Sequence, residues 1–297
     1  MSQQLAVEPA RLEHLLHSLL EYGIEFVPLS GYQLTEPLEL FDSNYILATL
    51  SENIRQCLTK IEIFEFINST NHYALNQKEK IGVYLAEYQT AGRGQQGRRW
   101  VSPYAKGICL SLKHSYDNLF YPLTGLNIAL ALTIVQGLRS LGAHDIEIKW
   151  PNDVMWQGRK LAGILLESRF LGNRNYEVVA GIGINVYPNL LKDIDRPWVD
   201  MCTVLGKKIS RNQLASILIE QGMQTLIFYP KQGLSAWMPY WQKVDMLYGR
   251  TVTLKHHSNS SLMMQGTAWG IDEEGALLLQ VGHHLQRYMA GEVSIAL

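Results

Sequence analysis

Three glycines and three arginines are concentrated in residues 91–100, and no acidic residue interrupts them: Gly92, Arg93, Gly94, Gly97, Arg98 and Arg99. Glycine lets backbone N–H groups approach a ligand closely, and arginine carries forked donors that match phosphate and carboxylate oxygens. The stretch therefore predicts a loop that folds over an anion. A cluster of surface arginines in a flexible loop is the alternative that this stretch alone leaves open.

The spacing of these glycines also fits the dinucleotide-binding fingerprint, which needs a helix directly after it to hold the pyrophosphate. Here Pro103 and a second strand-like run, residues 107–113, follow instead of a helix. The Gly-Lys-Ser or Gly-Lys-Thr sequence of a phosphate-binding P-loop does not occur in the chain. The residues thus argue against both of these nucleotide-binding folds.

Two further groups of residues could bind a ligand. Residues 68–71, Asn-Ser-Thr-Asn, directly follow a strand-like run at 61–67. Their small polar side chains could cap a helix that reaches residue 76, and they would also suit a polar ligand. Both roles can hold together. Lys160 begins an apolar strand after a hairpin at Gly158 and Arg159, and a lone lysine is costly to bury unless it is paired. A surface lysine at a hairpin is the alternative.

The elements that must position these groups include both helices and strands. Helices are expected at residues 9–22, 43–50, 121–141 and 211–228, and strands at 61–67, 81–87, 107–113, 145–150, 160–166 and 176–186. The helix at 121–141 is apolar nearly all round, which predicts that it is buried. Gly181 and Gly183 lie inside a strand, where glycine marks a bulge or the close approach of another group. An irregular loop follows at residues 187–199.

Three units are predicted along the chain, at residues 1–36, 37–247 and 248–297. From about residue 248 the composition changes to short strands, at 251–255, 262–271, 276–281 and 285–296, which predicts a small β-barrel. The first unit, a helix and a hairpin with strands at 24–27 and 32–34, is similar to the end of a winged helix-turn-helix, but fewer than ten residues precede its helix. Residues 1–39 carry one arginine and six glutamates, a formal charge of −5, whereas DNA affinity depends on lysine and arginine. A docking remnant is therefore expected, and DNA binding is not.

The composition of the 297 residues excludes several other classes of protein. The net charge of −1 indicates no general affinity for nucleic acid or an anionic membrane. Cys57, Cys109 and Cys202 form no Cys-x-x-Cys pair, so we expect three small buried side chains and neither a zinc site nor a disulfide framework. We expect no signal peptide in the first residues and no membrane span, because no apolar stretch is long enough to cross a bilayer. A cytoplasmic protein is expected.

Four segments occur together in one order: Ser-Thr-Asn at 69–71, Gly-Arg-Gly-x-x-Gly-Arg at 92–98, Lys-Trp-Pro-Asn-Asp at 149–153 with Lys-Leu-Ala-Gly at 160–163, and Gly-x-Gly-Ile-Asn at 181–185. This combination resembles the biotin protein ligases, including the bifunctional ligase/biotin-operon repressors of bacteria. The resemblance runs from about residue 30 to the C-terminus. It implies an α+β protein, whose catalytic domain is related to the class II synthetases and has a mixed sheet with helices, followed by an SH3-like barrel.

The resemblance also implies a two-step reaction. Biotin and ATP form biotinyl-5′-adenylate and pyrophosphate, and a lysine of the biotin carboxyl carrier protein of acetyl-CoA carboxylase then accepts the biotin. The residues matched to biotin are Ser69, Thr70, Asn71, Gln89, Gly92, Arg93, Lys160, Gly163, Gly181 and Gly183, with Lys160 and Arg93 as catalytic groups. The residues matched to the nucleotide are Arg93, Arg98, Trp100, Asn152, Asp153, Asn185 and Trp198. Asn152 and Asp153 would also face Mg²⁺. Trp198 matches an aromatic residue that stacks on adenine in the family, and ordinary packing is the alternative role for it.

The chain departs from the repressor pattern in two places. Its N-terminal unit is shortened, which puts repression in doubt, and Gln95 stands where the family usually has an arginine after the second loop glycine. A lipoate or octanoate ligase and a biotin-responsive DNA-binding repressor are the alternative functions. The sequence leaves the oligomeric state open between a monomer and a ligand-promoted homodimer.

Overall fold

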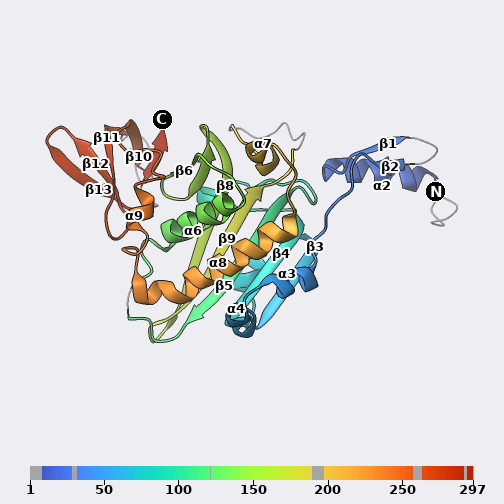
Figure 1. Cartoon of the computed structure of the whole chain (residues 1–297), viewed down its shortest axis with the longest axis horizontal. Coiled ribbons are helices and arrows are strands. Elements are labelled where there is room, and N and C mark those ends of the chain that lie inside the picture. Colours follow the sequence, from blue (N-terminus) through green and yellow to red (C-terminus); the bar gives the residue numbers. More distant parts are fainter. Residues whose placement is uncertain are drawn as a thin grey trace.

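The computed structural model describes residues 9–28, 32–120, 122–188, 197–256, 263–290 and 293–296. A seven-stranded mixed sheet in the order β3-β4-β5-β9-β8-β7-β6 forms its centre (Figure 1). Its strands are β3 (Lys60–Ile67), β4 (Ile81–Gln89), β5 (Gly107–Tyr116), β6 (Ile146–Lys149), β7 (Asp153–Trp156), β8 (Arg159–Gly172) and β9 (Asn175–Asn185). Strands β3 and β4 are parallel, and each of the other neighbouring pairs is antiparallel.

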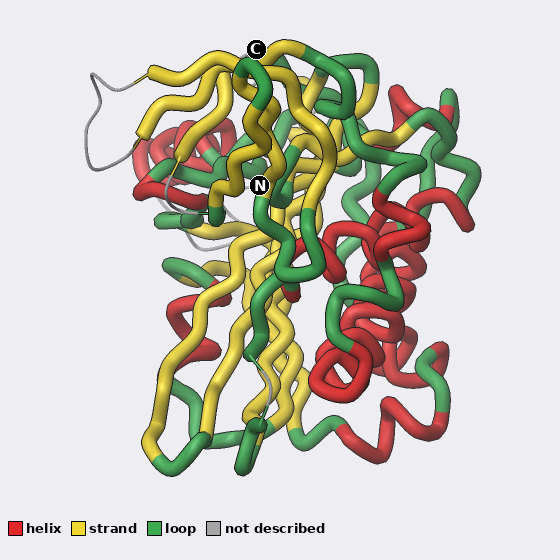
Figure 2. Tube along the Cα trace, turned by 90° about the vertical axis from the view of Figure 1, so that its left-hand side faces the viewer, coloured by secondary structure: helices red, strands yellow, loops and turns green. Residues whose placement is uncertain are grey.

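The long helices gather on one face of this sheet (Figure 2). They are α6 (Leu126–Ser140) and α8 (Arg211–Gln232), joined by the short α3 (Ser43–Thr49) and α4 (Glu52–Cys57). Helix α6 is buried nearly all round, as its composition predicts. It begins five residues later than the predicted residue 121, because Gly125 precedes it in a left-handed conformation (φ +79°) that a helix does not continue through.

The opposite face of the sheet carries α5 (Thr70–Leu75), which Ser69 caps as predicted. Beneath this helix lies a small apolar cluster of Ala74, Tyr84 and Val179. The rest of this face, next to α5, holds the predicted ligand-binding segments.

The C-terminal strands form a separate five-stranded antiparallel sheet in the order β13-β12-β11-β10-β14. They are β10 (Thr251–His256), β11 (Met263–Ile271), β12 (Leu277–Val281), β13 (His284–Tyr288) and β14 (Val293–Ala296). The single strand predicted at 285–296 is wrong: it is two strands, because β13 pairs with β12 whereas β14 crosses to β10. The indole of Trp150 donates to the carbonyl of Gly275 at 2.9 Å and joins this sheet to the β6–β7 hairpin.

The N-terminal unit comprises α2 (Pro9–Glu21) and the hairpin of β1 (Phe26–Pro28) and β2 (Tyr32–Leu34); the predicted turn at 29–31 lies outside the described residues. The ring of Tyr22 packs edge-on against Phe66 and Tyr88, each at 5.0 Å between centroids. The N–H of Tyr104 also donates to the carbonyl of Tyr22 at 2.8 Å. The unit is therefore docked on the central sheet. None of the described helices is long and apolar enough to cross a membrane.

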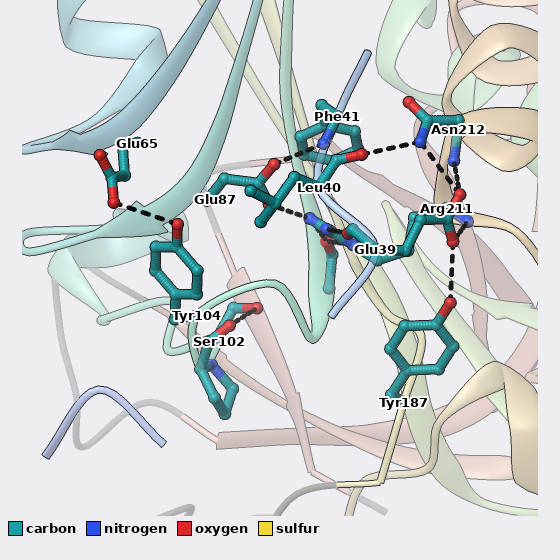
Figure 3. A network of polar contacts seen from close by, with 12 residues as sticks. Glu39, Leu40, Phe41, Glu65, Glu87, Ser102, Tyr104, Tyr187, Arg211 and Asn212 are labelled. Atoms are coloured by element: carbon teal, nitrogen blue, oxygen red, sulfur yellow. Dashed lines mark hydrogen bonds and ion pairs between the residues drawn. The ribbon is translucent and has the colours of Figure 1, made fainter. Parts of the chain in front are cut away.

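The chain between this unit and the sheet is held by the carboxylate of Glu39 (Figure 3). Glu39 accepts hydrogen bonds from the hydroxyls of Ser210 (2.5 Å) and Tyr187 (2.9 Å), and from the backbone of Arg211 (2.7 Å) and Asn212 (3.2 Å) at the start of α8. Burial alone would raise the pKa of Glu39, but the hydrogen bonds from Ser210, Arg211 and Asn212 outweigh it and lower the pKa to about 2. Glu39 thus caps the start of α8 and fixes Tyr187, two residues after the end of β9.

The fully buried Arg211 extends this network. Its guanidinium donates to the carbonyl of Gly107 (Nε 3.0 Å), pairs with the carboxylate of Glu87 (2.8 Å) and lies 4.0 Å from the ring centre of Phe41. Glu87 in turn accepts the N–H of Phe41 at 2.6 Å. Residues 39–41 are therefore an integral part of the fold around the central sheet.

We expect Glu39→Gln to change the acid stability of the protein. Because the pKa of Glu39 is depressed from 4.5 when the protein folds, its contribution is present above pH 4.5 and is lost as the pH falls towards 2. Allowing for partial exposure, the variant should lose about 1–2 kcal/mol in the free energy of unfolding at pH 7. The difference from the wild type should shrink towards zero at the acid end, measured by urea unfolding across this range. A difference that does not depend on pH would contradict the role of the charge, and Glu13→Gln, at an exposed position, is the control.

Candidate functional site

The floor of the site is a set of positions in register on three adjacent strands. Gly183 on β9 pairs with Gly163 on β8, and Gly181 pairs with Ser111 on β5 and with Leu165 on β8. Residues paired across neighbouring strands point to the same face of a sheet. The glycines therefore leave a floor without side chains on the face that carries α5.

Side chains from two other segments lie directly on these glycines. A Cβ atom on Gly181 would come within 2.4 Å of the Asn71 side-chain oxygen, and one on Gly183 within 2.4 Å of the Trp100 ring. The glycines thus mark a close approach, one of the two alternatives that the sequence left open. The approaching groups are the start of α5 and the end of residues 91–100, called here the glycine-arginine loop.

The polar end of the site is built at the start of α5. The N–H of Thr70 donates to Gln89 Oε1 (2.8 Å), and the hydroxyl of Ser111 donates to Asn71 Oδ1 (2.5 Å). The amide nitrogen of Asn71 donates to the carbonyl of Leu165 (3.2 Å). Ser69, Thr70 and Asn71 are all buried. The cluster therefore caps a helix and also gathers small polar groups, which are the two roles expected for residues 68–71.

The glycine-arginine loop forms a small hairpin closed by two backbone hydrogen bonds. The N–H of Gly94 donates to the carbonyl of Arg98 (2.7 Å), and that of Trp100 donates to the carbonyl of Gly92 (2.9 Å). At its tip lies the single 3₁₀ turn η1 (Gln95–Gly97). The Arg98 guanidinium donates to the side chain of Gln96 within the loop (2.9 Å). Arg98 therefore does not extend over the glycine floor.

The loop is attached to the sheet through Glu167, near the middle of β8. Its Oε2 atom accepts from Asn71 Nδ2 (2.9 Å) and forms an ion pair with Arg93 Nη2 (3.1 Å). One carboxylate oxygen thus connects the polar end of the site to the arginine that the sequence matched to the substrate's anions.

At the other end of the floor stands Lys160. Its ammonium pairs with Asp153 Oδ1 (2.6 Å) and lies 5.7 Å from the centre of the Trp100 ring. The indole nitrogen of Trp100 is buried and has no hydrogen-bond partner among the described residues. A cation and an unused N–H donor therefore stand beside the glycine floor, where an anionic or polar ligand could accept from both.

Several of the predicted nucleotide-binding residues lie around Lys160, whereas Arg93 and Arg98 make their contacts elsewhere. The N–H of Lys160 donates to the carbonyl of Pro197 (2.9 Å) and its carbonyl accepts the N–H of Val199 (3.0 Å), which sets Trp198 beside it. Asn185 Nδ2 donates to the carbonyl of Val199 (3.2 Å). The amide of the buried Asn152 donates to the carbonyl of Ile164. Residues 189–196 of the intervening loop lie outside the described part of the chain.

Sequence reasoning missed two members of the site, Ser111 and Glu167. Ser111 is fully buried, and Glu167 holds both Asn71 and Arg93. Ser111 stands between Leu110 and Leu112 in an apolar strand, so its polar character was a signal that could have been used. Glu167 ends the apolar run of β8 and carries no such local signal.

Glu167→Gln should loosen the glycine-arginine loop in the ligand-free protein. A glutamine can still accept from Asn71, but it loses the ion pair with Arg93, which at this degree of exposure is worth about 1 kcal/mol or less. Amide hydrogen exchange of residues 91–100 should therefore become about two- to fivefold faster. Arg169→Gln, on the same strand but beside Glu177, is the control. Unchanged exchange in the Glu167 variant would show that this ion pair does not hold the loop.

Comparison with known proteins is consistent with this arrangement. Residues 63–185 match the model of the Biotin/lipoate A/B protein ligase family, and residues 248–295 match that of the Biotin protein ligase C terminal domain. Bifunctional ligase/repressor BirA of Escherichia coli is 30% identical over 302 residues, which cover 99% of this chain and 91% of the relative. Biotin--[acetyl-CoA-carboxylase] ligase of Paracoccus denitrificans is 31% identical over 70% of this chain and 88% of its own length.

A solved structure shares the fold: biotin protein ligase from Aquifex aeolicus in complex with biotin and ATP has a TM-score of 0.68 and 23% identity, and the match covers 80% of this chain and 98% of that one. The catalytic and C-terminal family matches fall on the seven-stranded and five-stranded sheets described above. The chain belongs to the biotin protein ligase family. The predicted α+β fold with a C-terminal β domain is thereby confirmed.

Proposed function

We propose that the chain is an ATP-dependent biotin protein ligase. It joins biotin to ATP as biotinyl-5′-adenylate and then transfers the biotin to a lysine of the biotin carboxyl carrier protein of acetyl-CoA carboxylase. The observation that carries this proposal is the glycine floor between a buried polar cluster at Thr70 and a lysine ammonium at Lys160. A ligand with a polar head, an apolar chain and a terminal carboxylate fits these three parts in order.

In this proposal the ureido head of biotin lies at the start of α5. Gln89 and Thr70 offer the polar groups, while Asn71 braces the site, because its amide hydrogens are already donated to Leu165 and Glu167. A lost hydrogen bond at a buried head group would cost about 1–3 kcal/mol. The valeryl chain lies over the glycine floor, where its four methylenes would contribute about 3 kcal/mol.

Adenylation brings two anions together, since the carboxylate oxygen of biotin must approach the α-phosphorus of ATP. Lys160 supplies fixed positive charge for this approach. Arg93 would add a second charge once it turns from Glu167, with which it is paired at the polar end of the site. As the new oxygen–phosphorus bond forms, the bond to the bridging oxygen breaks and pyrophosphate leaves. Preorganised charge of this kind lowers the barrier by about 3–4 kcal/mol for each group. In the second step the amine of the carrier lysine attacks the carbonyl carbon of the mixed anhydride, and AMP leaves.

The nucleotide is assigned to the residues around the Lys160 backbone. Trp198 would stack on the adenine, with Asn185 and Asn152 nearby, whereas Arg98, which donates to Gln96 within its own loop, would have to turn to reach the nucleotide. A magnesium ion bound with ATP would neutralise phosphate charge, and it commonly takes one or two carboxylates with substrate phosphates for its remaining ligands. Asp153 fits that role because it presents a carboxylate beside Lys160, whereas the amide of Asn152 is directed to the carbonyl of Ile164.

Two alternatives are less well supported. The family model covers lipoate as well as biotin ligases, but the cluster of buried polar groups at the start of α5 suits a ureido head better than an apolar dithiolane ring. Repressor activity is in the names of some relatives, but the charge of −5 on residues 1–39 speaks against operator binding here. We propose that the chain consists of three units, at residues 1–36, 37–247 and 248–297. We also propose that the protein acts as a monomer or as a ligand-promoted homodimer.

The test of the proposed function is transfer to a purified biotin carboxyl carrier domain. With biotin, ATP and Mg²⁺, the protein should add one biotinyl group to one lysine, detected by mass spectrometry. A carrier domain with that lysine changed to arginine is the control. Failure to modify the carrier domain, with folded protein and all three components present, would contradict the proposal.

Gln95→Arg should make the protein retain its adenylate longer. An arginine at this position would add one charge-assisted contact, worth about 1.5–3 kcal/mol, or about a tenfold to hundredfold slower release of biotinyl-adenylate. Gln95→Met, which adds no charge, should not slow release. Dissociation rates of the adenylate from the three proteins would decide this, and equal rates for the wild type and the arginine variant would refute it.

A further inference from the structure

Strand β5 holds both ends of the short helix α5 with two side chains on one face. Ser111 contacts the start of the helix, with its hydroxyl 2.7 Å from Thr70 Oγ1 and 2.5 Å from Asn71 Oδ1. Lys113, two residues further along the strand, contacts the end of the helix. Side chains at i and i+2 of a strand share a face, so the pair forms a two-point attachment.

The ammonium of Lys113 is fully buried and uses all three of its donors. It donates to the carbonyls of Ala74 (3.1 Å) and Gln77 (2.6 Å) and pairs with Glu177 Oε1 on β9 (2.6 Å). A buried charge is costly unless it is paired and hydrogen-bonded, and here both conditions are met. These two carbonyls lie at the C-terminal end of α5 and just beyond it, where a helix carries partial negative charge that an ammonium stabilises.

Helix α5 depends on such anchors. It has six residues, far fewer than a helix needs to be stable by itself in water, so tertiary contacts must set its position. Its first turn carries Thr70 and Asn71 at the polar end of the site. A tilt of the helix at its far end would therefore move the groups assigned to the ureido head.

We infer that Lys113, paired with Glu177, is a positioning residue that fixes α5 and thereby sets recognition of the ureido head. This inference rests on the proposed function. The inference predicts that a change at Lys113 weakens binding of the ureido head and leaves binding of the carboxylate end of biotin unaffected. Lys160 and Asp153, which face the other end, are held by the β7–β8 hairpin and do not contact the Lys113 cluster.

The test replaces the ion pair by apolar residues in Lys113→Met/Glu177→Leu, because such replacements of a buried pair usually keep the fold. Biotin should bind about 10- to 100-fold more weakly, while the dissociation constant for ATP changes by less than about threefold. Affinities for 2-iminobiotin, changed only in the ureido group, and norbiotin, shortened only in the chain, locate the effect. The preference for biotin over 2-iminobiotin should fall at least about fivefold, and the preference over norbiotin should stay constant.

Two more variants complete the design. Arg169→Met removes the exposed cation 3.9 Å from Glu177 and should leave every affinity unchanged. Lys113→Arg is the milder change if the double variant does not fold: its planar head cannot meet the same three acceptors, so it should show the same ureido-specific pattern at a smaller size.

The outcomes are distinct. Unchanged biotin affinity in a folded Lys113 variant, or equal weakening of biotin, 2-iminobiotin, norbiotin and ATP, would overturn the positioning role. Absence of biotin binding by the wild-type protein would instead overturn the proposed function itself.

Discussion

Lys160→Ala is expected to reduce biotin-dependent ATP–pyrophosphate exchange by about 10²-fold or more while the protein stays folded. Lys160 pairs with Asp153 and stands beside the glycine floor, so its loss removes fixed charge from the place where the carboxylate and the α-phosphate meet. Alanine also leaves Asp153 without its cation, which adds repulsion against the incoming phosphates.

Arg159→Ala is the matched control for this experiment. Arg159 precedes Lys160 on β8, but its guanidinium stacks on Trp156 at 4.9 Å instead of facing the floor. Its exchange rate should stay within about threefold of the wild type. Near-normal exchange by a folded Lys160→Ala protein would remove Lys160 from the mechanism.

Gly183→Ala is expected to weaken biotin binding by about 10²-fold or more. The added methyl group would lie 2.4 Å from the Trp100 ring, far inside van der Waals contact, so the indole must leave the floor. Biotin titration followed by calorimetry measures this loss.

Gly94→Ala serves as the control for that variant, because a Cβ at Gly94 would meet its nearest neighbour at an ordinary 3.4 Å and its φ of −115° suits any residue. Biotin affinity should change less than about threefold. The double change Gly183→Ala/Trp100→Ala should bind no more weakly than Trp100→Ala alone if the clash with the indole is the cause. Wild-type affinity in Gly183→Ala would show that this floor does not hold biotin.

Local sequence signals predicted most of the elements that carry the site. Ser69 begins α5 and Asp42 caps α3, because each side chain accepts backbone hydrogen bonds from the first turn. The short strand β7 and the helices α7 (Met201–Leu205) and α9 (Met238–Trp241) were not predicted. With four or five residues each, they carry no complete period of apolar residues and are fixed by tertiary contacts.

The candidate site was predictable where one segment carries its own motif. Lys160 and Asp153 come from such segments, and the structure brings them together. Contacts between distant segments were not predictable. Asn71 meets Ser111 across 40 residues and Glu167 across 96, and nothing near either residue in the chain indicates its partner.

The loop between the N-terminal unit and the sheet shows the same limit. Residues 35–37 lie at the predicted boundary between two units, yet Glu39 and Phe41, shortly after them, bind α8 and β4 through Arg211 and Glu87. A buried arginine–glutamate pair joins residues 124 positions apart, and sequence spacing cannot reveal such a pairing.

The most direct measurement of the central claim is ATP–pyrophosphate exchange by the purified wild-type protein with biotin, with lipoate and with no added acid. The account predicts exchange that depends on biotin and remains at the background rate with lipoate. Exchange driven by lipoate as well as by biotin, or no exchange with biotin in the presence of Mg²⁺, would contradict it.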